Sequence, residues 1–176
     1  MPAPQRQGPA GRDAPPIEFT EFYAAHFQRI ALQLYAYLGD HAEAQDLTQE
    51  AFCRALDRWS GVSGYEDPSA WVRRVAWNLA TSRLRRVQTA MRFLARQREE
   101  HVPGPEPDRV ALVRALATLP ERQRRALVLY HLGHLSVAEI AALEQVAEGT
   151  VRSWLSRGRS ALAAYFTEIR QAVRHA

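Results

Sequence analysis

Arginine and serine residues recur at helical spacing near the carboxyl end of the sequence. Residues 136–159 predict two short helices joined by a tight turn, and the second carries Arg152, Ser153, Ser156 and Arg157 roughly opposite an apolar side. A guanidinium group can hold a guanine edge or a phosphate, and a serine hydroxyl can bond a base or the backbone. This pattern is typical of a helix-turn-helix, whose second helix enters the major groove of DNA. A solvated polar face is the alternative interpretation.

A second candidate surface is acidic. On the helix predicted for Ala42–Trp59, apolar side chains cover one half of the helical wheel, and Glu43, Asp46, Glu50 and Asp57 share the other half. A stripe of carboxylates does not suit contact with DNA, which is a polyanion. The stripe is therefore either a solvated face or a surface that docks on a basic protein partner.

A third candidate surface combines arginines with aromatic rings. Residues 68–98 contain eight arginines and no acidic residue, with Trp71, Trp77 and Asn78 among them. This combination suits melted DNA, because bases stack on rings while guanidinium groups meet phosphates. Alternatively, the two tryptophans fill the core of a helix bundle, and Asn78 caps a backbone group instead of bonding a base edge.

Helical periodicity predicts the elements that carry these surfaces. Apolar residues recur at three- and four-residue steps from Ile17 until Gly39 and Asp40 end the first helix. Asp67 and Pro68 form a good start for the third helix, as a cap and a first-turn proline. The later helices are predicted over residues 42–59, 69–86 (fraying toward 100), 108–119, 120–132, 136–143 and 147–166, with a loop over 60–67. No strand-like alternation of useful length occurs, so we predict an all-α fold.

Prolines separate these helices into two small helical domains. Residues 101–108 contain three prolines and a glycine, which excludes regular structure there. The predicted organisation is a disordered tail over 1–16, a helical domain over 17–98, a flexible linker over 99–108, a helix-turn-helix domain over 109–168 and a short tail over 169–176.

Composition restricts the class of protein further. The 176 residues are 47% hydrophobic and 24% charged, which is typical of a globular protein. The net charge is only +4, but the sequence pI of about 9.7 favours a polyanionic partner. All 23 basic residues counted as lysine or arginine are arginines. Cys53 is the single cysteine, which excludes an internal disulfide, and we expect it to be partly exposed beside the acidic stripe. Without a signal peptide or a long apolar run, we expect a cytoplasmic location and no membrane partner.

Signatures of enzymes are absent from the sequence. It has no glycine-rich phosphate loop and no nucleophile elbow, and its six histidines are scattered without a metal-binding pattern. We therefore expect no catalytic residue, no metal and no cofactor.

Together these motifs resemble the sigma-70 family of bacterial RNA polymerase initiation factors, and in particular its short extracytoplasmic-function members. Residues 39–52 (GDHAEAQDLTQEAF) resemble the core-binding helix of region 2, and residues 67–80 (DPSAWVRRVAWNLA) resemble its promoter-melting and −10 segment. Residues 119–129 (LPERQRRALVL) and 148–153 (EGTVRS) resemble region 4. The resemblance covers residues 18–166. The DPSAW arrangement is also similar to an actinobacterial branch, in agreement with the arginine-only composition.

The resemblance implies a partner for each surface. The implied contacts with the clamp helices of the polymerase β′ subunit are Asp46, Gln49 and Glu50. The implied −10 contacts are Asn78, at a pocket for one base, with Arg73, Arg74, Trp77 and Arg83 around it. The implied −35 contacts are Arg152, Ser153, Ser156 and Arg157. The implied partners are core RNA polymerase, through its β′ and β subunits, promoter DNA and a separate anti-sigma factor.

Three residues depart from the family pattern. Gln145 stands where the turn usually has glycine, which costs about 1 kcal/mol if φ is positive. Ala147 replaces a serine-type cap, with a loss of about 1 kcal/mol. Trp154 occupies a position that is more often basic.

We therefore predict a non-catalytic promoter-specificity factor that binds core polymerase, melts and reads the −10 element, and reads the −35 element. An autonomous helix-turn-helix regulator that acts without polymerase is the alternative, and it leaves the acidic and arginine-rich helices without a role. A nucleic-acid-processing enzyme is a third hypothesis, but the sequence contains no recognisable set of catalytic residues.

Overall fold

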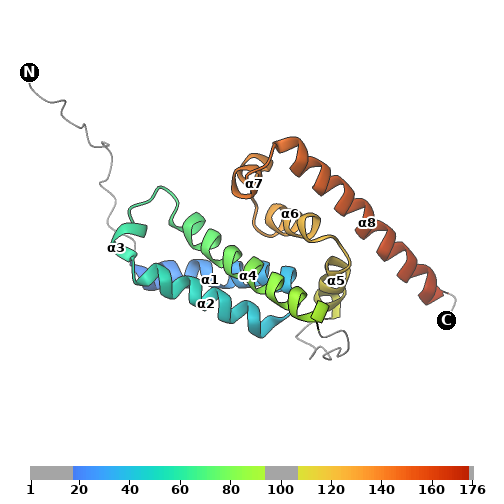
Figure 1. Cartoon of the computed structure of the whole chain (residues 1–176), viewed down its shortest axis with the longest axis horizontal. Helices are drawn as coiled ribbons and strands as arrows, with labels where there is room; N and C mark the ends of the chain where they lie inside the picture. Colours follow the sequence, from blue (N-terminus) through green and yellow to red (C-terminus); the bar gives the residue numbers. More distant parts are fainter. Residues whose placement is uncertain (1–17, 94–106, 175–176) are drawn as a thin grey trace, which may run out of the picture.

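The computed structural model describes residues 18–93 and 107–174, which form helices joined by short turns (Figure 1). No strand occurs in this part of the chain, and the all-α prediction is confirmed. In chain order the helices are α1 (Phe19–Leu38), α2 (His41–Leu56), α3 (Trp59–Val62), α4 (Pro68–Phe93), α5 (Pro107–Ala117), α6 (Glu121–His131), α7 (Val137–Glu144) and α8 (Glu148–Arg174).

The N-terminal bundle consists of α1 to α4. Leu34, Phe52 and Val72, from α1, α2 and α4 respectively, are completely buried where these three helices pack together. The ring of Phe22 lies 4.9 Å from that of Trp59, so aromatic residues close the end of the bundle next to α3. Such large rings supply much of the apolar area that a small bundle can bury.

Local caps explain where the first helices begin and end. Gly39 has a φ of 83°, in the left-handed region that glycine adopts without a Cβ clash, and it ends α1. Asp40 accepts a hydrogen bond from the Glu43 N–H (2.9 Å) at the start of α2. Asp67 accepts one from the Ala70 N–H (3.0 Å) at the start of α4, which confirms the predicted cap.

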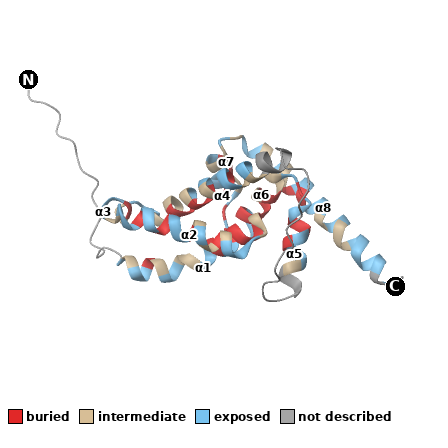
Figure 2. Cartoon of the chain, turned by 60° about the horizontal axis from the view of Figure 1, so that its bottom comes forward, coloured by how far each residue is buried: buried red, intermediate tan, exposed pale blue. Residues whose placement is uncertain are grey.

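The C-terminal domain consists of α5 to α8. Leu127 of α6, Ile140 of α7 and Val151 and Leu155 of α8 are buried among these helices. The α7–turn–α8 unit has the predicted helix-turn-helix connectivity. In Figures 1 and 2 the far end of α8 projects beyond the rest of the molecule.

Several boundaries differ from the predictions. Helix α8 continues to Arg174, through residues predicted to form a tail, because its last two turns contain no helix breaker. Helix α5 begins at Pro107, inside the predicted linker, where a first-position proline needs no N–H partner. Helix α2 ends at Leu56, and short α3 takes up the start of the predicted loop. The predicted tail over 1–16 and the linker up to residue 106 lie outside the described residues.

The two domains pack against each other, with α5 and α6 on α1. The Tyr37 hydroxyl of α1 donates a hydrogen bond to Glu121 Oε1 of α6 (2.8 Å). Val113 of α5 is buried next to Gly39. In Figure 2 the buried residues of α4, α5 and α6 lie toward the centre of the molecule. We call this the closed arrangement. Among the described helices, none is long and apolar enough to cross a membrane.

Candidate nucleic-acid interface

The first helix of the helix-turn-helix has a complete capping box. The Ser136 hydroxyl accepts a hydrogen bond from the Glu139 N–H (3.2 Å), and Glu139 Oε2 accepts one from the Ser136 N–H (2.8 Å). The Ser136 hydroxyl also donates to the same carboxylate oxygen (2.7 Å). These bonds from Ser136 hold the pKa of Glu139 below its usual range. This reciprocal pair of bonds fixes the start of α7.

The turn and the packing of α8 fix the direction of the second helix. Gln145 ends α7 with a φ of 56°, so the turn takes the left-handed conformation without a glycine. Gly158 faces α6, where an added Cβ would lie 2.8 Å from Leu127 Cδ1. Because α8 approaches α6 so closely, its side with Val151 and Leu155 is buried and its opposite side faces outward.

The predicted −35 residues lie on the outward part of α8. Arg152, Ser156 and Arg157 are exposed, and Ser153 is half-buried. Arg152 is held by an ion pair with Glu148, one turn earlier on the same helix (2.5 Å). An exposed pair of this kind contributes a few tenths of a kcal/mol, so Arg152 remains available to a stronger partner.

The predicted −10 residues lie on more than one side of α4. Arg74 and Asn78 are exposed and one turn apart, so they share a face. Arg83 is also exposed and forms an ion pair with Glu43 of α2 (2.9 Å). The structure therefore brings Arg74 and Asn78 together, whereas the guanidinium of Arg83 is already paired with Glu43.

Arg73 and Trp77 occupy a different, buried side of α4. Trp77 is completely buried, with its ring 4.9 Å from that of Tyr37 and its Nε1–H donating to Gln33 Oε1 (3.4 Å). Arg73 is 8% exposed and lies 3.6 Å from Asp67. The sequence left Trp77 either as a DNA contact or as a core residue, and in the closed arrangement it is a core residue. The expected DNA contacts of Trp77 and Arg73 are not possible there, because no solvent-facing surface remains on the ring and little on the guanidinium.

Sequence reasoning missed the residue that covers Trp77. The guanidinium of Arg125, from α6, lies 5.1 Å from the Trp77 ring centroid, and its Nη1 donates to Thr81 Oγ1 (2.7 Å). Its Nε lies 2.7 Å from Glu144 Oε1 of α7, as an ion pair without the alignment of a hydrogen bond. Burial raises the pKa of Glu144, and the charge of Arg125 opposes this shift. The arginine cluster of α6 was visible in the sequence, but nothing local distinguishes a DNA-facing arginine from one that joins two domains.

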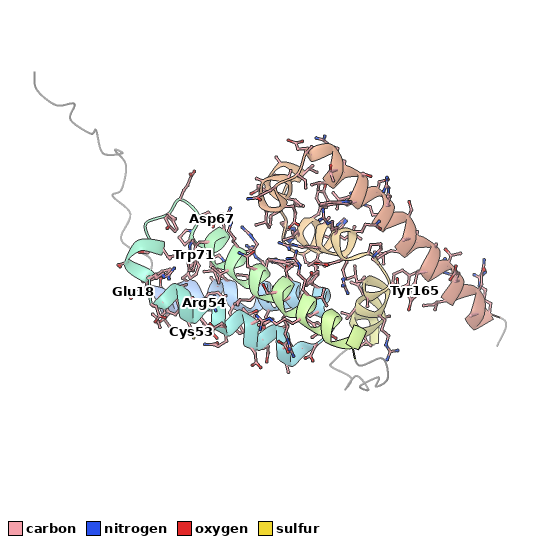
Figure 3. The ribbon with its side chains drawn as sticks, in the orientation of Figure 1. Glu18, Cys53, Arg54, Asp67, Trp71 and Tyr165 are labelled. Atoms are coloured by element: carbon pink, nitrogen blue, oxygen red, sulfur yellow. The ribbon has the colours of Figure 1, made fainter. Side chains whose placement is uncertain are left out.

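The predicted polymerase contacts lie on an exposed face of α2. Asp46, Gln49 and Glu50 are all exposed, and Gln49 Oε1 accepts a hydrogen bond from the Tyr23 hydroxyl (2.8 Å). Glu50 forms an ion pair with Arg54 (2.8 Å). Cys53 is exposed beside them, as expected (Figure 3).

One apolar residue of this helix is not covered. Leu56 lies on the apolar half of the helical wheel but is 53% exposed. It is the last residue of α2, where the helix ends and the chain turns into α3, so no neighbouring helix covers it.

Comparisons with known proteins identify two family regions in the chain. Residues 22–90 match the family described as Sigma-70 region 2, and residues 109–162 match Sigma-70, region 4. The chain is 33% identical over 143 residues to the ECF RNA polymerase sigma factor SigC of Mycobacterium tuberculosis, covering 78% of this chain and 77% of that protein. It is 31% identical over 151 residues to the RNA polymerase sigma-E factor of Streptomyces antibioticus, covering 83% of each.

A solved structure has a similar fold. The sigma factor RpoE in complex with the anti-sigma factor NepR from Bartonella quintana has a TM-score of 0.74 with 21% identity, covering 85% of this chain and 96% of that one. With both regions matched in order, and relatives over 30% identical along more than three quarters of its length, the chain belongs to the sigma-70 family of RNA polymerase sigma factors and to its extracytoplasmic-function (ECF) group.

Proposed function

We propose that the three exposed surfaces divide the work of a sigma factor, which binds core RNA polymerase and directs it to promoters. The face of α2 with Asp46, Gln49 and Glu50 binds the clamp helices of the β′ subunit. The observation that carries this proposal is the opposite charge of the surfaces: carboxylates dominate this face of α2, whereas arginines dominate the outward side of α8. One face suits a basic protein surface, and the other suits DNA.

In this proposal α8 reads the −35 element. Arg152, Ser153, Ser156 and Arg157 lie on the outward part of the second helix of a helix-turn-helix, which is the part that enters the major groove. The ion pair with Glu148 exchanges for contacts with a base edge or a phosphate when DNA binds.

Helix α4 reads and melts the −10 element. Asn78 bonds a base edge and Arg74, one turn away, meets a phosphate, while Arg83 exchanges Glu43 for DNA. Arg73 and Trp77 become accessible when α6 and α7 move away from α4. The segment over 99–108 connects the two domains during this movement, and the interactions with polymerase and DNA offset the loss of interdomain contacts.

The chain contributes binding and positioning, and the chemistry of RNA synthesis belongs to the polymerase. Because both partners are in the cytoplasm, the proposal places the chain there as well.

The test combines the full chain with core RNA polymerase and sheared genomic DNA from the same cell, followed by sequencing of transcript 5′ ends. We expect a defined set of start sites that requires both proteins. A chain that retards duplex DNA in a gel but neither binds core polymerase nor changes its start sites is an autonomous regulator, and that result contradicts the proposal.

A further inference from the structure

Trp154 of α8 lies under an arginine from α6. The Cζ atom of Arg122 is 5.6 Å from the centroid of the Trp154 ring, within the range of a cation–π interaction. Trp154 is half-buried and Arg122 is exposed. Arg122 of α6 therefore places a positive charge beside this ring of α8.

A second pair joins the same two helices. The Cζ atom of Arg159 in α8 lies 5.6 Å from the centroid of the Tyr130 ring in α6. Arg159 is exposed, and Tyr130 is 37% exposed. Each pair therefore consists of one residue from α6 and one from α8, and the two pairs lie at opposite ends of the contact between these helices.

The two pairs lie on opposite flanks of α8. Positions five residues apart differ by about 140° around a helix. The buried side, with Leu155 and Gly158, lies between Trp154 and Arg159. The outward side with the predicted base readers therefore has one arginine–aromatic pair on each flank.

Neither flanking arginine forms an ion pair within the described part of the chain, although the charge of Arg122 acts on Glu144 and opposes the rise in the pKa of that carboxyl. Among the described residues, Arg122 and Arg159 have no carboxylate within ion-pair distance, in contrast to Arg125 with Glu144 and Arg152 with Glu148. An aromatic ring restrains the guanidinium through its face and leaves the N–H groups at its edge free to donate.

We propose that Arg122 and Arg159 bind backbone phosphates on the two strands that border the major groove, and that Trp154 and Tyr130 are positioning residues that hold them there. A helix inserted in the groove, which is about 12 Å wide, meets one phosphate backbone on each flank. These contacts are independent of base sequence. The inference rests on the proposed role of α8 as the DNA-binding helix.

The test measures binding of the full chain to a mixed-sequence duplex of about 20 bp over a range of KCl concentrations. Loss of one phosphate contact reduces the slope of log K against log[KCl] by about 0.9. We expect this reduction for Arg122→Ala and for Arg159→Ala. Arg170→Ala is the matched control, because it removes an exposed arginine of α8 far from the turn, and its slope should stay closer to that of the wild type.

The positioning role has its own readout. Trp154→Leu keeps an apolar side chain but removes the ring face, and we expect part of the slope to be lost. Trp154→Phe should restore most of it. In the Trp154→Leu background, Arg122→Ala should lower affinity less than it does in the wild type, and Tyr130→Leu should act in the same way on Arg159. Circular dichroism checks that each variant remains folded.

Two results separate this inference from the proposed function. If Arg157→Ala weakens duplex binding but Arg122→Ala and Arg159→Ala resemble Arg170→Ala, the flanking contacts are refuted and α8 remains the DNA-binding helix. If Arg157→Ala has no effect, or the wild-type chain does not bind the duplex, the proposed role of α8 fails and the flanking contacts fail with it. Full additivity of Arg122→Ala and Trp154→Leu refutes the positioning role alone.

Discussion

The Arg125 guanidinium of α6 lies 5.1 Å from the Trp77 ring centroid of α4, so a residue of the C-terminal domain covers a residue of the N-terminal bundle. Trp77 is completely buried, and Arg125 also bonds Thr81 one turn further along α4. The domain that we propose to read the −35 element therefore shields part of the helix that we propose to read the −10 element. If these roles are correct, we expect simultaneous binding of both elements to require that α6 leaves α4.

The hydrogen bond between Tyr37 and Glu121 offers a mild way to weaken the closed arrangement. Tyr37→Phe removes the hydroxyl but keeps the ring that packs against Trp77 and Arg124. Loss of one interdomain hydrogen bond costs about 1 kcal/mol, which raises the ratio of open to closed chains about fivefold. Single-molecule energy transfer between dyes on exposed Cys53 and on a cysteine introduced by Arg170→Cys measures this ratio.

The matched control for this change is Tyr165→Phe, because Tyr165 lies on the far part of α8, away from the interface (Figure 3). It should leave the open fraction unchanged. An open fraction that is equal in wild type, Tyr37→Phe and Glu121→Ala would show that this bond does not hold the domains together.

The capping box of α7 predicts a dependence of stability on acid pH. Hydrogen bonds from Ser136 lower the folded-state pKa of Glu139, so their contribution is present above the unfolded value of about 4.5 and is lost as the pH falls through the folded value. Ser136→Ala should lower the free energy of unfolding at neutral pH by about 1 kcal/mol and by less in acid. Urea unfolding from about pH 7 to pH 3 measures both. Parallel curves for the variant and the wild type would exclude this coupling, and exposed Ser160→Ala serves as the control.

Periodicity predicted the helices well because their determinants are local. Gly39 and Asp40 end one helix and start the next, and Asp67 and Ser136 cap two more, each through bonds within three or four residues. The acidic face of α2 was also predictable from periodicity, because the apolar side of α2 packs on α1 and α4 and leaves Asp46 and Glu50 exposed.

The closed arrangement could not be predicted in this way. A helical wheel shows which side of α4 carries Trp77, but the partner that buries it comes from α6, far along the chain. For the same reason the wheel does not reveal that Leu56 is exposed, because its side of α2 is apolar but it is the last residue of the helix. The aromatic partners of Arg122 and Arg159 likewise depend on how α6 packs on α8.

The turn of the helix-turn-helix offers a stabilising substitution. Gln145 has a φ of 56°, where a Cβ is unfavourable, and its side chain is exposed. Gln145→Gly should raise the free energy of unfolding by about 0.5–1 kcal/mol and the melting temperature by about 1–4 °C. Gln145→Ala keeps the Cβ and should bring no gain. A stabilisation of equal size in both variants would mean that the left-handed backbone is not its source.

The acidic face of α2 yields the most direct test of polymerase binding. Asp46→Ala combined with Glu50→Ala removes two exposed carboxylates, and we expect affinity for core polymerase to fall at least tenfold because basic groups of the partner lose their counter-charges. The unfolding free energy should change by no more than about 0.5 kcal/mol, since the exposed pair of Glu50 with Arg54 contributes little. Glu168→Ala, on exposed α8, is the control for loss of charge alone. Arg54→Ala is a second control, because it breaks the same ion pair but leaves both carboxylates, so the affinity for core polymerase should stay the same or increase. Affinity is measured by fluorescence anisotropy of the labelled chain. If the double variant binds core polymerase as tightly as the wild type, this face of α2 is not part of the polymerase interface.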